Sequence, residues 1–120
     1  MVRTVDKRDS ELLRGTLASL VLATLEAGAL YGYDIAREIR ARTDGILHLK
    51  EGSLYPALHS MEADGLLTSK WVPRDKGPNR KYYGLTRKGK RLLRAERARW
   101  QRFRDAVDVV LQPHPAEGRP

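Results

Sequence analysis

The chain has 120 residues, of which 41% are hydrophobic and 32% charged, so it has room for one packed domain with at most one appended element. It contains no cysteine, which excludes disulfides, thiol redox sensing and zinc ribbons. A mean hydropathy of −0.55 and the lack of a long apolar run exclude a transmembrane helix, and the charged N-terminal residues do not resemble a signal peptide, so we expect a cytoplasmic protein with a net charge of +8.

Apolar spacing predicts three helices in the first half of the chain. The first covers about residues 10–27 and is apolar on several sides, which indicates burial between other elements. The second covers about residues 31–44. The third is expected to begin after an N-cap at Ser53, with Pro56 in its first turn, where the missing N–H costs nothing, and to end at Gly65. Its inward face carries Leu54, Leu58 and Met61.

The second half of the chain predicts a hairpin followed by a long helix. Residues 66–72 and 81–85 have the composition of strands, and the intervening segment contains two prolines and a glycine, which favours a loop. Alternation leaves open which of Tyr82 and Tyr83 faces the core. Thr86 is a suitable N-cap for a last helix that ends near Leu111. The expected units are a flexible N-terminus (1–9), a domain of three helices and a hairpin (10–86), a C-terminal helix (87–111) and a disordered tail (112–120).

Three helices followed directly by a hairpin are typical of a winged helix-turn-helix, in which the third helix enters the major groove of DNA. We therefore predict a mainly α fold with a small β-hairpin and an appended C-terminal helix. The charge supports a polyanionic partner. Residues 1–70 carry nine Lys/Arg and ten Asp/Glu, whereas residues 71–104 carry thirteen Lys/Arg and two acids. Charge alone would equally fit a solvated helix face.

Three segments resemble the PadR family of bacterial transcriptional regulators. They are LYGYDIAREI (30–39), GSLYPALHSMEADGLL (52–67) and RKYYGLTRKGKRLL (80–93), in matching order and separation. A single helix after the hairpin is similar to the short subfamily. The resemblance implies a homodimeric repressor that binds an inverted-repeat operator and often releases it on binding a small aromatic or amphipathic effector.

On the third helix, the residues left on the outer side are candidates for DNA contact. The free N–H groups and positive dipole end of the helix suit a phosphate, to which Ser53 and Tyr55 can add hydroxyl donors. His59 is better placed for base edges. The alternatives are a purely capping Ser53, a Tyr55 packed against the second helix and a solvated His59. The predicted contacts of this region are Lys50, Ser53, Tyr55, Pro56 and His59.

The loop of the hairpin is the second candidate for DNA contact. A flexible basic tip can enter a minor groove or contact the flanking backbone. A solubilising loop is the alternative. The predicted contacts of the wing are Arg74, Lys76, Arg80 and Lys81.

Apolar residues on the last helix recur in steps of three and four, which predicts a heptad-like seam. Since the other three helices already form a core, we expect this seam to be covered by a second copy in a twofold dimer, which also suits a palindromic operator. The predicted dimer contacts are Leu93, Trp100, Phe103, Val107 and Val110. Trp100 also matches a position where some short PadR-like regulators stack flat drugs, although filling the interface together with Phe103 is the favoured role.

Other functional classes are less well supported. The three histidines are scattered, and no nucleophile–base pair, glycine-rich phosphate loop or metal-ligand spacing is present, so we expect neither an enzyme nor a bound cofactor or metal. A winged helix that binds RNA or protein is the remaining alternative. It lacks an aromatic stacking platform beyond the tyrosines.

Overall fold

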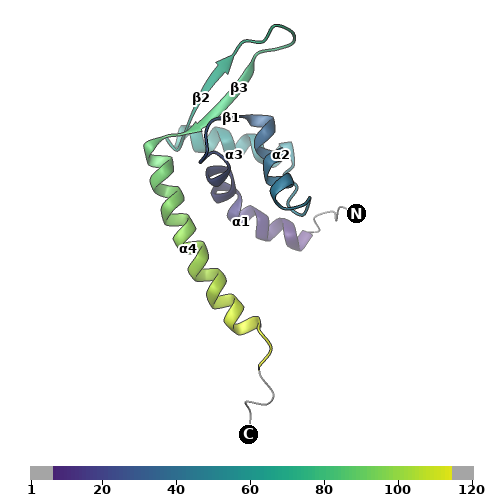
Figure 1. Cartoon of the computed structure of the whole chain (residues 1–120), viewed down its shortest axis with the longest axis vertical. Helices are drawn as coiled ribbons and strands as arrows, with labels where there is room; N and C mark the ends of the chain where they lie inside the picture. The colour runs from purple at the N-terminus through teal and green to yellow at the C-terminus, as the bar shows by residue number, and fades with distance from the viewer. Residues whose placement is uncertain (1–6, 115–120) are drawn as a thin grey trace.

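The computed structural model describes residues 7–114 and confirms the predicted order of three helices, a hairpin and a long final helix (Figure 1). It adds one short strand that the sequence did not predict. The elements are α1 (Lys7–Thr24), β1 (Leu30–Tyr31), α2 (Gly32–Arg42), α3 (Glu51–Ala63), β2 (Leu67–Val72), β3 (Arg80–Leu85) and α4 (Arg87–Leu111).

The ends of the first helix differ from the expected ones. α1 begins at Lys7, so residues 7–9, expected to be part of a flexible N-terminus, are helical, and it ends three residues before the expected boundary at residue 27. The rest of that predicted N-terminus, residues 1–6, lies outside the described residues. So does residue 115 onward of the predicted tail. α4 ends at Leu111, as its sequence pattern predicted.

β1, β3 and β2 form a three-stranded antiparallel sheet in that order. β1 pairs with β3 through Leu30 and Tyr31, whose partners are Tyr83 and Tyr82. The short strand therefore ties the segment between α1 and α2 to the root of the hairpin. A strand of two residues has too few positions to show the alternation by which strands are recognised in a sequence.

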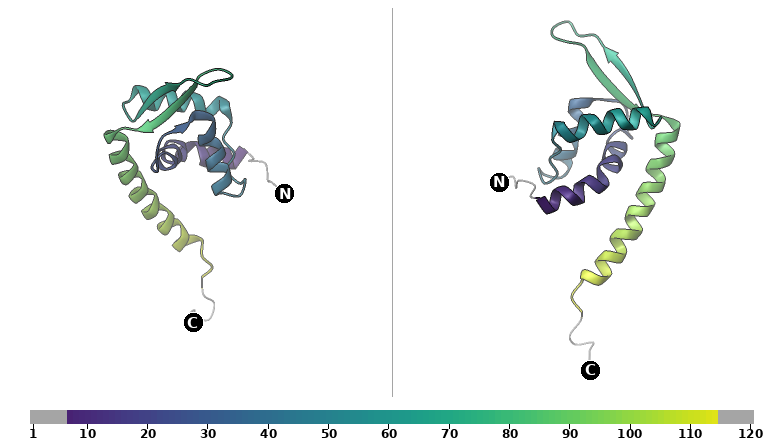
Figure 2. Two further views of the ribbon diagram at one scale, coloured as in Figure 1. Left: turned by 45° about the horizontal axis from the view of Figure 1, so that its top comes forward. Right: turned by 180° about the vertical axis from the view of Figure 1, so that it is seen from behind.

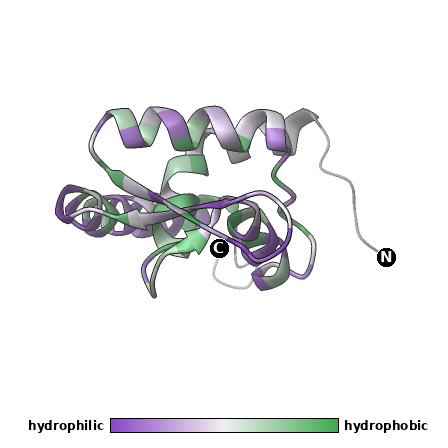
Figure 3. Ribbon diagram, turned by 90° about the horizontal axis from the view of Figure 1, so that it is seen from above, coloured by the Kyte–Doolittle hydropathy of each residue, from purple (hydrophilic) through white to green (hydrophobic). Residues whose placement is uncertain are grey.

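The core lies where α1, α2 and α3 meet the sheet. Figure 3, seen from above, shows hydrophobic and hydrophilic bands alternating along the helices, as expected when one face of each packs inward. Tyr83 is 2% exposed, which settles that it, and not the half-buried Tyr82, faces the core. The core residues are Val21, Leu22, Leu25, Ile35, Ile39, Leu49, Leu54, Leu58, Met61, Leu66, Leu67, Tyr83 and Leu93.

α4 starts against the hairpin root and then runs away from the body of the molecule (Figures 1 and 2). The Thr86 hydroxyl accepts a hydrogen bond from the Gly89 N–H at 3.0 Å, which confirms the predicted N-cap. The same hydroxyl donates to the carbonyl of Gly65 at 2.6 Å. These bonds hold the first turn of α4 against the turn that follows α3.

Leu93 corrects one prediction for the last helix. Its side chain is 4% exposed in the single chain and belongs to the core beneath α1. Leu93 therefore stabilises its own chain and leaves almost no surface for a second copy. The premise that α4 has no partner within the chain is wrong for its first half, because α1 packs against it.

Candidate nucleic-acid interface

The N-terminus of α3 lies three residues earlier than an N-cap at Ser53 would place it. Lys50 is the N-cap, and its carbonyl accepts hydrogen bonds from the N–H groups of Ser53 and Leu54 at 3.0 and 2.9 Å. Ser53 is thus inside the helix, and Pro56 lies in the second turn, so both predictions of their positions were wrong. Lys50 caps through its backbone alone, which a search for hydroxyl or carboxamide caps cannot detect.

The earlier start does not change which side of α3 is exposed. Leu54, Leu58 and Met61 are buried against the core, as predicted. The predicted contacts Lys50, Ser53, Pro56 and His59 are all exposed. These four residues therefore lie on the solvent side of this helix.

Tyr55 is the half-buried member of the predicted set. A Cβ added to Gly32 would lie 3.4 Å from Cε1 of Tyr55, so the ring packs across the first residue of α2. Burial, together with the neighbouring Tyr31 and Glu51, raises the pKa of Tyr55. Its hydroxyl therefore keeps its proton near neutral pH and can donate a hydrogen bond to a phosphate. Packing and phosphate contact are compatible here.

The tip of the hairpin carries Arg74 and Lys76, both exposed. Gly77 turns the chain with a φ of 85°, a conformation that favours glycine. The Arg74 guanidinium lies over this turn, since a Cβ at Gly77 would be 3.5 Å from its Nη1. The hairpin projects beyond the helices (Figure 1), so these cations are presented at its outer end.

Arg80 and Lys81 lie on opposite faces of the hairpin and have different surroundings. The Arg80 guanidinium stacks over the ring of Tyr31, with Cζ 4.6 Å from the ring centroid. Tyr31 is in turn 6.1 Å from Tyr82 and 6.2 Å from Tyr33 between centroids. Arg80 therefore sits at the junction of the hairpin with the N-terminus of α2, not at the tip.

Lys81 is tied to α3. Its ammonium lies 3.4 Å from Glu62 Oε1, and the Ser69 hydroxyl donates to the other carboxylate oxygen of Glu62. The hydrogen bond from Ser69 and the charge of Lys81 lower the pKa of Glu62. This network fixes the angle between the hairpin and α3, so Lys81 has a positioning role that the sequence did not suggest.

One large side chain of this region was not among the predicted contacts. Trp71 on β2 is 62% exposed, and the Lys81 ammonium lies 5.8 Å from its ring centroid. Alternation along the strand puts Trp71 on the same face as the buried Leu67, so the strand pattern alone does not predict the exposure of Trp71.

The predicted dimer residues of α4, Leu93 excepted, lie on its free half. Trp100 is 47% exposed, Phe103 61% and Val110 81%, while Val107 is partly covered. The rings of Trp100 and Phe103 contact one another, with centroids 6.0 Å apart. The structure thus brings these residues together as one exposed apolar strip.

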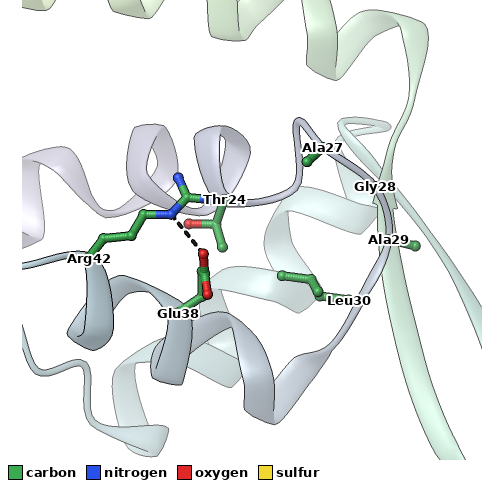
Figure 4. Close-up of a pocket in the computed structure, with 7 residues that line it drawn as sticks. All are labelled: Thr24, Ala27, Gly28, Ala29, Leu30, Glu38 and Arg42. Carbon is green, nitrogen blue, oxygen red and sulfur yellow. Dashed lines mark hydrogen bonds and ion pairs between the residues drawn. The ribbon is translucent and has the colours of Figure 1, made fainter.

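A shallow cavity of about 240 Å³ lies between the end of α1 and α2 (Figure 4). Its rim carries the ion pair of Arg42 Nε with Glu38 Oε2 at 2.9 Å. It does not include Trp100, the residue suggested for an effector. Within the described residues, no group of three or more His, Asp or Glu side chains is placed to hold a metal ion, and no helix is long and apolar enough to cross a membrane.

A three-helix core, a basic hairpin and an outward-facing third helix define a winged helix-turn-helix protein. Comparison with known proteins identifies its family. Residues 21–95 match the model of the transcriptional regulator PadR-like family. The chain belongs to this family and is therefore a DNA-binding transcriptional regulator.

Individual relatives are similar to this chain over most of its length. A transcriptional regulator from Clostridium thermocellum superimposes with a TM-score of 0.78 at 27% identity, covering 85% of this chain and 99% of its own. A PadR family transcriptional regulator from Eggerthella lenta is 35% identical, with a TM-score of 0.71 and coverage of 88% and 86%. An uncharacterized protein of Lysinibacillus sphaericus is 29% identical over 103 residues, covering 86% of this chain and 94% of its own.

Proposed function

We propose that this regulator is a cytoplasmic homodimeric repressor that binds an inverted-repeat operator. Two copies pair through the second half of α4, and the twofold axis sets two α3 helices into major grooves one helical turn apart. The observation that carries the proposal is the exposed apolar strip on α4. Release by a small aromatic effector completes the proposed cycle.

The strip supports dimerisation because of its composition and place. Trp100, Phe103, Val107 and Val110 recur at heptad-like spacing on a segment that extends away from the body of its own chain (Figure 2). Large apolar side chains gathered on one exposed face mark protein interfaces. A second copy of the same helix offers a matching strip, and a twofold arrangement buries both at once.

The DNA contacts divide into two kinds. Lys50, Ser53 and Tyr55 suit phosphates at the N-terminus of α3, whereas His59, one turn further along, suits a base edge. Arg74 and Lys76 at the hairpin tip suit the neighbouring minor groove or backbone. If the dimer engages about six to ten phosphates, affinity should fall by roughly 10³ to 10⁵ between about 50 and 200 mM salt.

Trp100 is the residue we assign to the effector. Its indole is partly exposed on α4 beside Phe103, and a flat aromatic ring stacks well on planar compounds. In a dimer this face would lie near the twofold axis, so a ligand held there would bias the spacing of the two α3 helices.

Selection of bound sequences from a random duplex pool, combined with light scattering, tests the proposal. We expect a palindromic site whose half-sites are about one helical turn apart, bound by a dimer. Competition with single-stranded RNA serves as the control. A monomer at micromolar concentration, no sequence preference at moderate salt, or stronger binding to RNA would each overturn the proposal.

A further inference from the structure

We propose that Trp71 is a DNA-contacting residue that holds the sugar–phosphate backbone where it passes between α3 and the hairpin. This inference builds on the DNA-binding function of the protein and adds a contact on the inner face of the wing. It rests on the side of the hairpin that Trp71 occupies, on its exposure and on its neighbours.

The register of the hairpin decides which way Trp71 points. Trp71 is paired with Lys81, and Ser69 with Tyr83, so side chains at these positions share one face. Tyr83 is buried in the core, and Ser69 bonds to Glu62 of α3. The face that carries Trp71 is therefore the one turned toward α3.

Exposure changes along this face from the root of the hairpin outward. Leu67 is buried at 2%, Ser69 is half-buried, and Trp71 is 62% exposed. Trp71 thus lies just beyond the point where α3 stops covering the sheet. A winged helix that places α3 in the major groove and its hairpin tip in the minor groove passes one DNA strand through this space.

In the protein without DNA, neighbouring side chains already restrict the position of the Trp71 side chain. The Lys81 ammonium lies 5.8 Å from the Trp71 ring centroid and 3.4 Å from Glu62 Oε1. Glu62 is held in turn by Ser69. A side chain supported in this way loses less conformational entropy on binding than a free one.

The chemistry of the surroundings favours a DNA strand over a protein. The hairpin, residues 67–85, carries five Lys/Arg and one acid, so its field attracts a polyanion. An indole offers an apolar face for deoxyribose and one N–H donor for a phosphate oxygen. A protein-docking site would group several exposed apolar side chains, whereas Trp71 is flanked in the strand by the exposed Lys70 and the half-buried Val72.

Intrinsic fluorescence tests the contact directly. The chain has two tryptophans, so Trp100→Phe leaves Trp71 as the sole indole emitter. The variant is titrated with the duplex obtained from the random-pool selection, labelled so that its anisotropy reports binding in the same cuvette. We expect acrylamide quenching of Trp71 to fall at least twofold at saturation. Unchanged emission and quenching with a saturated anisotropy signal would overturn the contact while leaving DNA binding intact. The unsubstituted protein is titrated in parallel, and no anisotropy change with it would instead contradict the proposed operator binding.

Affinity of the unlabelled protein provides the second test. Trp71→Ala should weaken duplex binding roughly tenfold, the scale of one lost contact with its hydrogen bond, and Trp71→Phe should recover the part due to the apolar ring. Thr68→Ala, an exposed position of the same strand on the other face, should leave affinity unchanged and serves as the matched control.

Salt dependence separates this role from a merely structural one. An indole displaces no counterion, so Trp71→Ala should keep the slope of log affinity against log salt, whereas Arg74→Ala should reduce it by about one per site. Equal affinities of Trp71→Ala and Thr68→Ala, or a slope changed by Trp71→Ala, would overturn the proposal. So would retained duplex affinity combined with loss of binding to a protein partner, because Trp71 would then be a protein-docking residue.

Discussion

The two halves of α4 carry the same kind of apolar spacing and differ in how far their own chain covers them. In the first half, residues 87–97, Gly89 and Leu93 are buried against the rest of the chain. In the second half, residues 98–111, Trp100, Phe103 and Val110 are exposed. The comparison teaches that a heptad-like pattern records which face of a helix is to be covered, but not whether the covering surface comes from the same chain or from another.

The boundary between the two halves of α4 lies where α1 stops packing against it. α1 packs along the first half of α4 and then diverges from it (Figure 1). Arg97 joins α4 to the body through two hydrogen bonds to the Glu26 carboxylate, at 2.9 and 3.1 Å. Beyond this point every residue of the helix except the half-buried Val107 is exposed. Substitutions before Arg97 should therefore change the unfolding equilibrium, and substitutions after it should change the proposed dimerisation equilibrium.

The largest effect is expected in the first half. Leu93→Ala removes a side chain that is 4% exposed and leaves a cavity between α4 and the core. It should lower the free energy of unfolding by about 3 kcal/mol, measured by urea denaturation at fixed protein concentration. Gln101→Ala, at an exposed position on the same helix, should stay within about 0.5 kcal/mol. Equal losses in both variants would contradict the intramolecular role of Leu93.

A smaller effect on a different equilibrium is expected in the second half. Phe103→Ala truncates a ring that is 61% exposed in the single chain. Since both copies of a twofold dimer change, it should weaken dimerisation by about 2 to 3 kcal/mol, measured by sedimentation equilibrium. Arg102→Ala, its exposed neighbour, is the control. An unchanged dissociation constant for Phe103→Ala would show that the apolar strip serves another partner.

The features of the fold that the sequence predicted are those governed by neighbouring residues, and the features it missed depend on distant segments of the chain. Gly65 was expected to end α3 and does so with a φ of 78°, because a local rule governs a single position. Thr86 was likewise found as a cap. The burial of Leu93, the pairing of β1 with β3 and the tie of Lys81 to Glu62 depend on segments far apart in the chain. No local pattern contains that information.

The candidate DNA contacts show the same limit. The exposed face of α3 was predictable from Leu54, Leu58 and Met61, because helical periodicity fixes the opposite face. Whether Arg80 reaches the hairpin tip was not predictable, since its stacking on Tyr31 depends on β1 lying beside β3. The contacts themselves stay predictions.

The close contact between the first turn of α4 and the hairpin root allows a sharper test of how the first half of α4 packs. A Cβ on Gly89 would lie 2.2 Å from the Leu66 carbonyl oxygen, so Gly89→Ala must push α4 off the hairpin root. We expect a loss of about 1 to 2 kcal/mol in the free energy of unfolding. Gly52→Ala, in a helix and with nothing within 4 Å of the added carbon, should instead gain up to about 1 kcal/mol. Thermal melts of the two variants should move in opposite directions.

The smallest effect is expected at the boundary between the halves. The hydrogen bonds from Arg97, followed by its charge, hold the pKa of Glu26 below its ordinary value. A carboxyl whose pKa is lowered by folding stabilises the folded state above its unfolded pKa, and this contribution disappears as the pH falls through the lowered folded value. Glu26→Gln should therefore cost a little stability near pH 7 and nothing in strong acid. A double-mutant cycle with Arg97→Gln at both pH values isolates the pair. A coupling energy that persists in acid would mean that packing, and not charge, holds α4 at Arg97. The point at which α4 leaves the body would then be set by the shape of the contact alone.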